Sequence, residues 1–178
     1  MIVSRADEEA ATNGSPTWPQ TPRKEKHVSP QSKEEQMNQP KSVKNKALVI
    51  RSWEIVNQRN PDVIDEVYAP DFVWHEPDQD IRGSEEARQF VAMFFDAFPD
   101  INITIEDAIA EGDKVVTRWT IRGTHQGELM GIAPTERQIQ LEGITVHRIE
   151  GDKIVEEWER YDNLGMMQQL GVIEQPSE

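Results

Sequence analysis

Residues 101–125, INITIEDAIAEGDKVVTRWTIRGTH, contain two segments rich in β-branched residues on either side of a short turn. Such segments favour β-strands, and Glu111-Gly112-Asp113 between them is typical of a hairpin turn. The same pattern recurs downstream, where Glu150-Gly151-Asp152 separates two further segments of this kind. The pattern therefore predicts a run of four antiparallel strands. These strands are Ile101–Ala110, Val115–His125, Gln138–Ile149 and Ile154–Tyr161.

The segments before this run have apolar residues at helical spacing. A wide apolar face extends from Lys41 to Asn60-Pro61, and a short second helix follows over Asp62–Tyr68 with Pro61 as its first residue. A third helix begins at Ser84, where Ser-Glu-Glu-Ala resembles a capping box, and ends before Pro99.

Two short elements complete the pattern. Phe72–Glu76 reads as a strand followed by a loop to Gly83, and Leu164–Leu170 reads as a C-terminal helix. Helices that precede an antiparallel meander indicate an α+β fold rather than a parallel doubly wound sheet.

Composition divides the 178-residue chain into a tail and one domain. Residues 1–40 contain five of the eleven prolines among Ser, Gln, Lys and Glu, with few large aliphatic residues. Such a segment cannot offset the entropy of ordering by packing. We expect a disordered tail at 1–40 and a folded domain at 41–174.

The charge and the absence of cysteine limit partners and chemistry. The net charge of −14 repels nucleic acid phosphates and anionic membrane surfaces, so we expect neither as a partner. Without cysteine there is no disulfide, thiolate metal site or cysteine nucleophile. No secretory signal and no run of about 18 apolar residues occurs. We expect a cytoplasmic protein.

A series of short motifs, in order from about Lys44 to Gly171, resembles the SnoaL-like polyketide cyclases, also called ester cyclases, of the NTF2-like superfamily. Each motif alone is weak, but the ordered set is specific. The motifs include Ala-Pro-Asp-Phe-Val at 69–73, Ala-Phe-Pro-Asp at 97–100, Glu-Gly-Asp-Lys-Val-Val at 111–116, Gly-Thr-His-Gln-Gly-Glu at 123–128, Gly-Ile-Ala-Pro-Thr at 131–135, Trp158, Asp162 and Gln-Leu-Gly at 169–171.

The resemblance implies a cone in which a curved antiparallel sheet wraps against the N-terminal helices around a pocket. It also implies an intramolecular aldol cyclisation of a small apolar or polyketide substrate by acid/base catalysis, without metal or other cofactor. An isomerase or hydrolase of another small apolar molecule, or a non-catalytic binding module, are alternatives. We expect a homodimer formed by the outer sheet face, because related domains pair this way and the strands carry apolar residues on both faces.

Asp162 matches the position of the family's acid/base aspartate at the end of the last strand. At the mouth of an apolar pocket, the ionised form of a carboxyl group is disfavoured, which moves its pKa toward the working pH. Asp162 could instead cap the last helix. His75 is its expected partner, because the resemblance favours the strand face of His75 and Val73 inward. A rim or solvent position for His75 is the alternative.

Arg118 is the third expected catalytic residue, because its position in related proteins faces the pocket. There it would pair with Glu142 and polarise a substrate carbonyl, although a purely structural ion pair is an equal alternative. The chain has Thr145 where one branch of the family has a histidine. This departure argues against a polycyclic ester substrate and makes His75 the expected partner of Asp162.

Further residues are expected to bind substrate. Aromatic side chains would form the apolar wall, although aromatic residues at these spacings also form ordinary cores, and His125 would orient a lid loop carrying Met130–Pro134. His147, next to a charged turn, is expected at the surface. The histidines lack the helical spacing of a zinc site, so no metal is expected. The expected substrate-binding residues are Trp53, Phe94, Trp119, His125, Glu142 and Trp158.

Overall fold

The computed structural model describes residues 40–174, which form an α+β unit. The tail expected at 1–40 thus lies outside the described residues except for Pro40. The four strands expected from the hairpin pattern are confirmed to within one residue at each end. The elements are α2 (Lys41–Ser52), α3 (Glu54–Asn57), α4 (Val63–Val67), β1 (Tyr68–His75), β2 (Asp80–Arg82), α5 (Gly83–Ala97), β3 (Asn102–Glu111), β4 (Lys114–Thr124), β5 (Gln138–Glu150), β6 (Lys153–Tyr161) and α6 (Asn163–Leu170).

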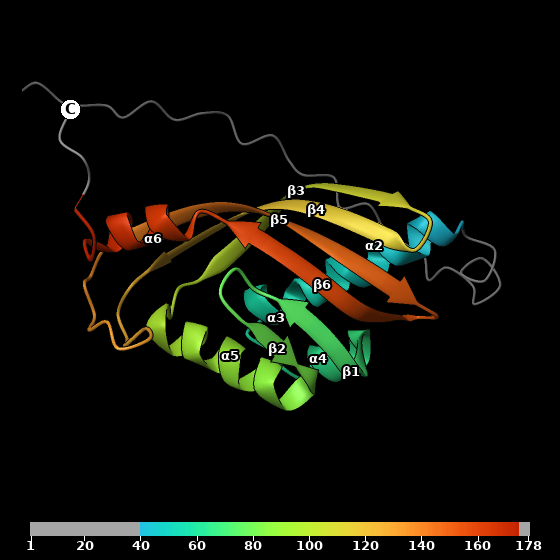
Figure 1. Ribbon diagram of the computed structural model, residues 1–178, viewed down its shortest axis with the longest axis horizontal. Coiled ribbons are helices and arrows are strands. Elements are labelled where there is room, and N and C mark those ends of the chain that lie inside the picture. Colours follow the sequence, from blue (N-terminus) through green and yellow to red (C-terminus); the bar gives the residue numbers. More distant parts are fainter. Residues whose placement is uncertain (1–39, 175–178) are drawn as a thin grey trace, which may run out of the picture. The chain divides into compact units, whose positions relative to one another are not determined.

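The strands form one sheet with the order β2-β1-β6-β5-β4-β3 (Figure 1). Strands β3 to β6 are antiparallel neighbours, but β1 pairs with β6 in parallel. The sheet is therefore mixed rather than wholly antiparallel. Strand β2 pairs with β1 within the stretch expected to be a loop. Strand β1 supplies backbone partners to the edge of β6, which would otherwise end the meander unpaired.

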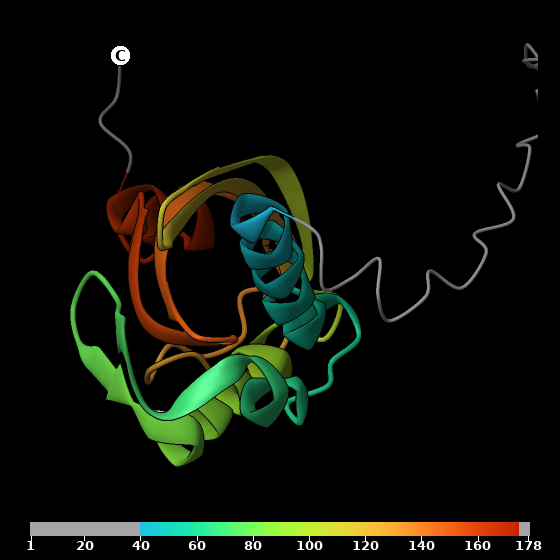
Figure 2. The same ribbon diagram turned by 90° about the vertical axis from the view of Figure 1, so that its right-hand side faces the viewer.

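The sheet curls around an interior that the helices close. Figure 2, which looks along the sheet, shows α2 on the concave side and α5 across the open side. Helix α2 packs against β3 and β4, and α5 packs against β1 and β2. The α+β cone is therefore confirmed. Fully buried core side chains include Val49, Phe72, Phe98, Val115 and Trp119.

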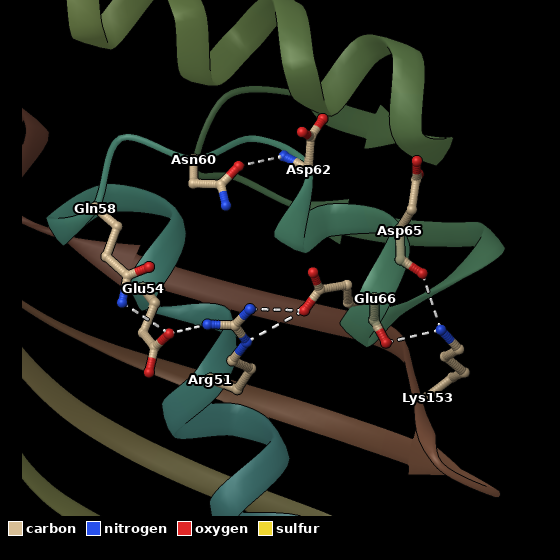
Figure 3. Close-up of polar contacts among 8 residues, drawn as sticks. All are labelled: Arg51, Glu54, Gln58, Asn60, Asp62, Asp65, Glu66 and Lys153. Atoms are coloured by element: carbon tan, nitrogen blue, oxygen red, sulfur yellow. Dashed lines mark hydrogen bonds and ion pairs between the residues drawn. The ribbon is translucent and has the colours of Figure 1, made fainter.

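Polar contacts tie the N-terminal helices to the start of β6 (Figure 3). Arg51 of α2 pairs with Glu54 and with Glu66, whose Oε2 lies 2.7 Å from Arg51 Nη2. The Lys153 ammonium donates to the carbonyls of Asp65 and Glu66 at 2.9 and 2.8 Å. These carbonyls belong to the last turn of α4, where orphan acceptors need donors. The contacts fix the orientation of α4 against the sheet.

The start of α5 differs from the expected capping box. The helix begins at Gly83, which has a φ of +69°. The N–H of Arg82 donates to the Glu86 carboxylate at 2.7 Å, which resembles the reverse half of a capping box but uses the residue one position further along. The Ser84 side chain bonds to Asp65 instead of capping the helix. Ser84 therefore joins α5 to α4.

Candidate active site

Alternation along the strands sorts their side chains between the concave and convex faces of the sheet. Thr145 of β5 lies opposite Glu159 of β6, and both are buried on the concave face with Trp119 of β4. Between these strands and the helices is a cavity of about 80 Å³. Its wall is mainly aromatic and aliphatic. Wall residues include Trp53, Trp74, Phe90, Phe94, Trp119 and Met166.

Two carboxyl groups line this apolar cavity. Glu76 follows β1 directly and is 7% exposed, and Glu159 of β6 is 6% exposed. Burial and the charge of Glu157 raise the pKa of Glu76 to about 7. Burial, reinforced by the charges of Glu76 and Glu157, raises the pKa of Glu159 well above its usual range. Burial favours the neutral form of a carboxyl group, and the charge that Glu76 gains on ionising disfavours ionisation of Glu159 further.

A directed hydrogen-bond chain fixes one oxygen of Glu159. The indole Nε1 of Trp119 donates to Thr145 Oγ1 at 2.8 Å, and the Thr145 hydroxyl donates to Glu159 Oε2 at 3.2 Å. An indole N–H can only donate, so Thr145 Oγ1 accepts from Trp119 and keeps its own O–H to donate to Glu159. Since Oε2 accepts, the proton of neutral Glu159 lies on Oε1. This oxygen is therefore the donor that Glu159 can offer to a bound molecule.

Tyr161 completes the polar part of the cavity wall. Its phenol is hydrogen-bonded to Glu76, which lowers the pKa of that carboxyl against the larger effect of burial. Burial and the charges of Glu76 and Glu159 raise the pKa of Tyr161. The phenol therefore stays neutral and donates to the ionised form of Glu76.

A second buried polar group lies next to the cavity. The His147 ring contacts Glu157 Oε1 directly through Nδ1, and its Nε2 lies 3.1 Å from Thr117 Oγ1. Glu157 also bonds to Tyr68. Neither His147 nor Glu157 lines the cavity. His147 is fully buried, so its expected surface position is wrong. Its side chain lies on the concave face of β5, and this face buries it although a charged turn is near in the sequence.

An open groove adjoins the cavity. The groove shares Glu76, Phe90 and Tyr161 with the cavity wall. Further carboxylates line it, and Met130 of the 125–137 loop contributes to its rim. The approach to the cavity is therefore acidic. The additional acidic residues of the groove are Asp78, Asp80 and Glu86.

The structure does not bring Asp162, His75 and Arg118 together. Asp162 is exposed and caps α6, with its Oδ1 accepting the Gly165 N–H at 2.8 Å. It does not line the cavity. Its surroundings thus correspond to the capping alternative, because the carboxylate already satisfies a free N–H at the helix start.

His75 lies on the convex face, stacked on Trp158 with ring centroids 5.6 Å apart. Its ring nitrogens lie 2.7 Å from Asp80 Oδ1 and 3.2 Å from Glu156 Oε1. Burial alone would lower the pKa of His75, but these two hydrogen bonds outweigh it and raise the pKa. The inward orientation expected for His75 is corrected: Phe72 and Trp74, on the other face of β1, fill the core.

Arg118 and Glu142 also lie exposed on the convex face. Arg118 pairs with Asp107 across β3 and β4, at 2.8 Å from Nη2 to Oδ2, instead of pairing with Glu142. His125 is buried, and its Nδ1 accepts the Thr135 N–H at 3.2 Å. It lies outside the cavity wall and holds the 125–137 loop together.

Trp53, Phe94 and Trp119 line the cavity, whereas Trp158 lies on the convex face. Their contact with substrate stays a prediction. Glu76 and Glu159 were not selected from the sequence, although one signal pointed to Glu76. With the aromatic face of β1 turned inward, alternation from Trp74 leads directly to Glu76.

Two further features, a metal site and a membrane-spanning helix, find no support among residues 40–174. Between residues 40 and 174, no three His, Asp or Glu side chains are arranged to hold a metal ion. None of the helices in that range combines the length and apolarity needed to cross a bilayer.

A curved sheet closed by helices around an apolar cavity with internal carboxyl groups defines an NTF2-like domain. The model of the SnoaL-like polyketide cyclase family matches residues 47–170, and the chain belongs to this family. No curated protein sequence matches at a significant level.

Solved structures from three Streptomyces species share the fold. AclR from S. galilaeus, a candidate hydroxylase, is 26% identical with a TM-score of 0.69, over 77% of this chain and 87% of its own. TsrD from S. laurentii is 26% identical with a TM-score of 0.69, over 76% and 100%. IdmH from S. antibioticus, a candidate polyketide cyclase, is 31% identical with a TM-score of 0.62, over 71% and 98%.

Proposed function

We propose that this chain is a cofactor-independent enzyme that uses Glu76 and Glu159 for acid/base catalysis on a small apolar or polyketide substrate. The reaction that fits best is an intramolecular aldol cyclisation. The observation that carries the proposal is that two buried carboxyl groups share one apolar cavity, both with raised pKa values, and that the charge of one disfavours ionisation of the other. Groups whose surroundings separate their pKa values are suited to opposite roles in proton transfer.

Glu76 is the proposed base, because a pKa of about 7 leaves it partly ionised at neutral pH. Its carboxylate takes a proton from the carbon beside a substrate carbonyl, and the C–H electron pair forms an enolate. The enolate oxygen accepts a hydrogen bond from the protonated Glu159. The enolate carbon then bonds to a second carbonyl carbon, whose oxygen takes the proton back from Glu76. Atoms and charge balance within the substrate and these two side chains.

The acidic groove supports a substrate without negative charge, since carboxylates along the approach repel an anion. The cavity size favours a second candidate function. Ligand pockets usually measure roughly 300–1,000 Å³, and this cavity measures about 80 Å³. Isomerisation of a compact ketone through the same enolate is therefore the alternative, and it would use the same two residues.

Proton abstraction can be measured without the natural substrate. We expect the protein to catalyse exchange of the α-protons of cyclopentanone with D₂O, followed by proton NMR. Glu76→Gln should lower this exchange about 10²- to 10⁴-fold, the usual contribution of a positioned base. The rate should rise with pH and level off above about 7, because only ionised Glu76 accepts a proton.

The matched control is Glu156→Gln, which alters a carboxylate on the convex face of the same strand as Glu159. It should exchange at the wild-type rate. Asp162→Asn separates this proposal from the expectation based on sequence. If Asp162→Asn strongly lowers the rate of proton exchange and Glu76→Gln does not, the catalytic residue is Asp162 and not Glu76.

We also propose that the protein is a homodimer that pairs through the convex face of the sheet. One apolar row crosses four strands there. In the pairing register, Ile109 lies beside Val116, Val116 beside Val146, and Val146 beside Trp158. Ile109 is 68% exposed, and Ile144, next to the row, is 48% exposed.

A further inference from the structure

The polar atoms of the cavity wall that lack partners are hydrogen-bond donors. The Nε1 atoms of Trp53 and Trp74 are buried and make no hydrogen bond of ordinary geometry among residues 40–174. Both side chains line the cavity. A buried N–H without an acceptor is costly and uncommon in native proteins. These two groups therefore require an explanation that the packing of the domain does not give.

Trp119 shows what a satisfied indole looks like in the same cavity. Its Nε1 donates to Thr145 Oγ1 at 2.8 Å. Trp53, by contrast, is 9% exposed, and its ring packs near two others, with centroids 6.0 Å from Trp119 and 5.9 Å from His147. Neither contact supplies an oxygen to its N–H.

Trp74 of β1 packs edge-to-face against Phe90, with centroids 5.5 Å apart. Its N–H is close enough to Glu159 to lower the pKa of that carboxyl, but it lacks the geometry of a full hydrogen bond. An oxygen that accepts from Trp74 would therefore lie beside Glu159. Because Oε1 of Glu159 carries the proton, the two groups would offer donors to one acceptor.

We propose that the indole N–H groups of Trp53 and Trp74 bind oxygen atoms of the substrate, so that the cavity selects a neutral carbonyl compound over a hydrocarbon of the same shape. Trp74 acts together with Glu159 on the oxygen that becomes the enolate. Trp53 binds an oxygen at its own side of the cavity. Donors placed before the reaction stabilise developing negative charge without reorganisation. The inference rests on the proposed use of this cavity for substrate.

The direct test observes the indole protons of the wild-type protein, labelled with ¹⁵N-tryptophan, while cyclopentanone is added. Substitution of each tryptophan by phenylalanine assigns the signals. Hydrogen bonding to the ketone should move the Trp53 and Trp74 indole protons downfield, whereas the Trp119 proton, already bonded to Thr145, should stay nearly unchanged. Methylenecyclopentane, in which CH₂ replaces the carbonyl oxygen, should leave all three without a downfield shift.

The second test compares dissociation constants for the two probes in Trp53→Phe. The substitution keeps an aromatic ring and removes the N–H. The preference for ketone over methylenecyclopentane should fall about three- to tenfold, as expected for one neutral hydrogen bond. The ratio of the two dissociation constants is used because any change in packing caused by the substitution affects both probes alike.

Unshifted Trp53 and Trp74 signals at saturating ketone, or an unchanged ratio in Trp53→Phe, would overturn the proposal and indicate that water satisfies these groups. Neither readout needs turnover. If Glu76→Gln leaves proton exchange unchanged while the indole signals shift, the proposed catalysis fails and the binding role stands. If Glu76→Gln lowers proton exchange but the indole signals do not shift, the proposed catalysis stands and the binding role of the two tryptophans fails.

Discussion

Glu157 affects the site without lining the cavity. It is 2% exposed and is held by His147 and Tyr68. Its charge raises the pKa of both Glu76 and Glu159, because like charges in a region of low dielectric disfavour one another's ionised forms. Glu157 is thus a positioning residue that adjusts proton affinity from behind the cavity wall.

Removing this charge gives a prediction with a defined sign. Glu157→Gln should lower the pKa of Glu76, so the carboxylate base survives to lower pH. The midpoint of the rate of cyclopentanone exchange against pH should therefore move to lower pH, as measured by proton NMR across the range 5 to 9. Glu156→Gln should keep the wild-type midpoint. A folded Glu157→Gln protein with an unmoved midpoint would rule out the proposed coupling.

Single residues show where sequence reasoning was limited. The strand alternation around His75 was correct, but the choice of its inward face relied on the resemblance rather than on the larger aromatic residues Phe72 and Trp74. Because side chains alternate along a strand, choosing the wrong face of β1 reverses all of them together. The cavity-facing residue is therefore Glu76 rather than His75. The face of Arg118 was reversed in the same way. Asp162 directly follows β6, and the same alternation, with Glu159 and Tyr161 facing the cavity, places it on the other face.

Among the elements, β5 positions Glu159 of β6, the proposed acid, through a glycine. A Cβ atom built on Gly143 would lie 2.2 Å from Trp119 Cζ2, so the indole packs directly on the strand backbone. This close packing brings Trp119 Nε1 to Thr145, which in turn bonds to Glu159. Only glycine leaves room for the indole at this point of β5.

Gly143→Ala should therefore displace the Trp119 indole. Overpacking of this kind costs about 1–3 kcal/mol in the free energy of unfolding, which urea titration measures. In a Trp119→Leu background, the same substitution should cost clearly less, because the clashing ring is gone. Equal costs in the two backgrounds would show that the close contact does not determine the effect.

The elements also show which parts of the fold a sequence specifies locally. Long segments with turns between them were sufficient to place β3 to β6, because each pairing joins neighbours in the chain. The parallel contact of β1 with β6 joins residues about 80 positions apart, such as His75 and Trp158. No local pattern specifies such a pairing. The break between α2 and α3 at Trp53 likewise results from tertiary packing, since the apolar pattern continues through it.

At the scale of the whole molecule, the two faces of the sheet carry different kinds of residue. The concave face holds the cavity and the buried glutamates, whereas the convex face carries the apolar row described above beside ion pairs such as Arg118–Asp107. A contiguous apolar surface with a charged border is typical of a protein–protein contact. In a two-fold dimer the same patch would meet itself, which requires a surface without a strong charge of one sign at its centre.

The dimer proposal predicts that the wild-type chain sediments as a dimer at tens of micromolar, an order-of-magnitude loading consistent with micromolar or tighter affinity. Ile144→Glu would place two charges at the contact, and the protein should sediment as a monomer. Ile144 is 48% exposed in the single chain, so the thermal stability of the monomer itself should change little. Leu164→Glu is the matched control, since Leu164 is 57% exposed but belongs to α6, and this variant should remain dimeric. A monomeric wild-type protein at this concentration, or an Ile144→Glu dimer as tight as the wild type, would show that the convex face is not the interface.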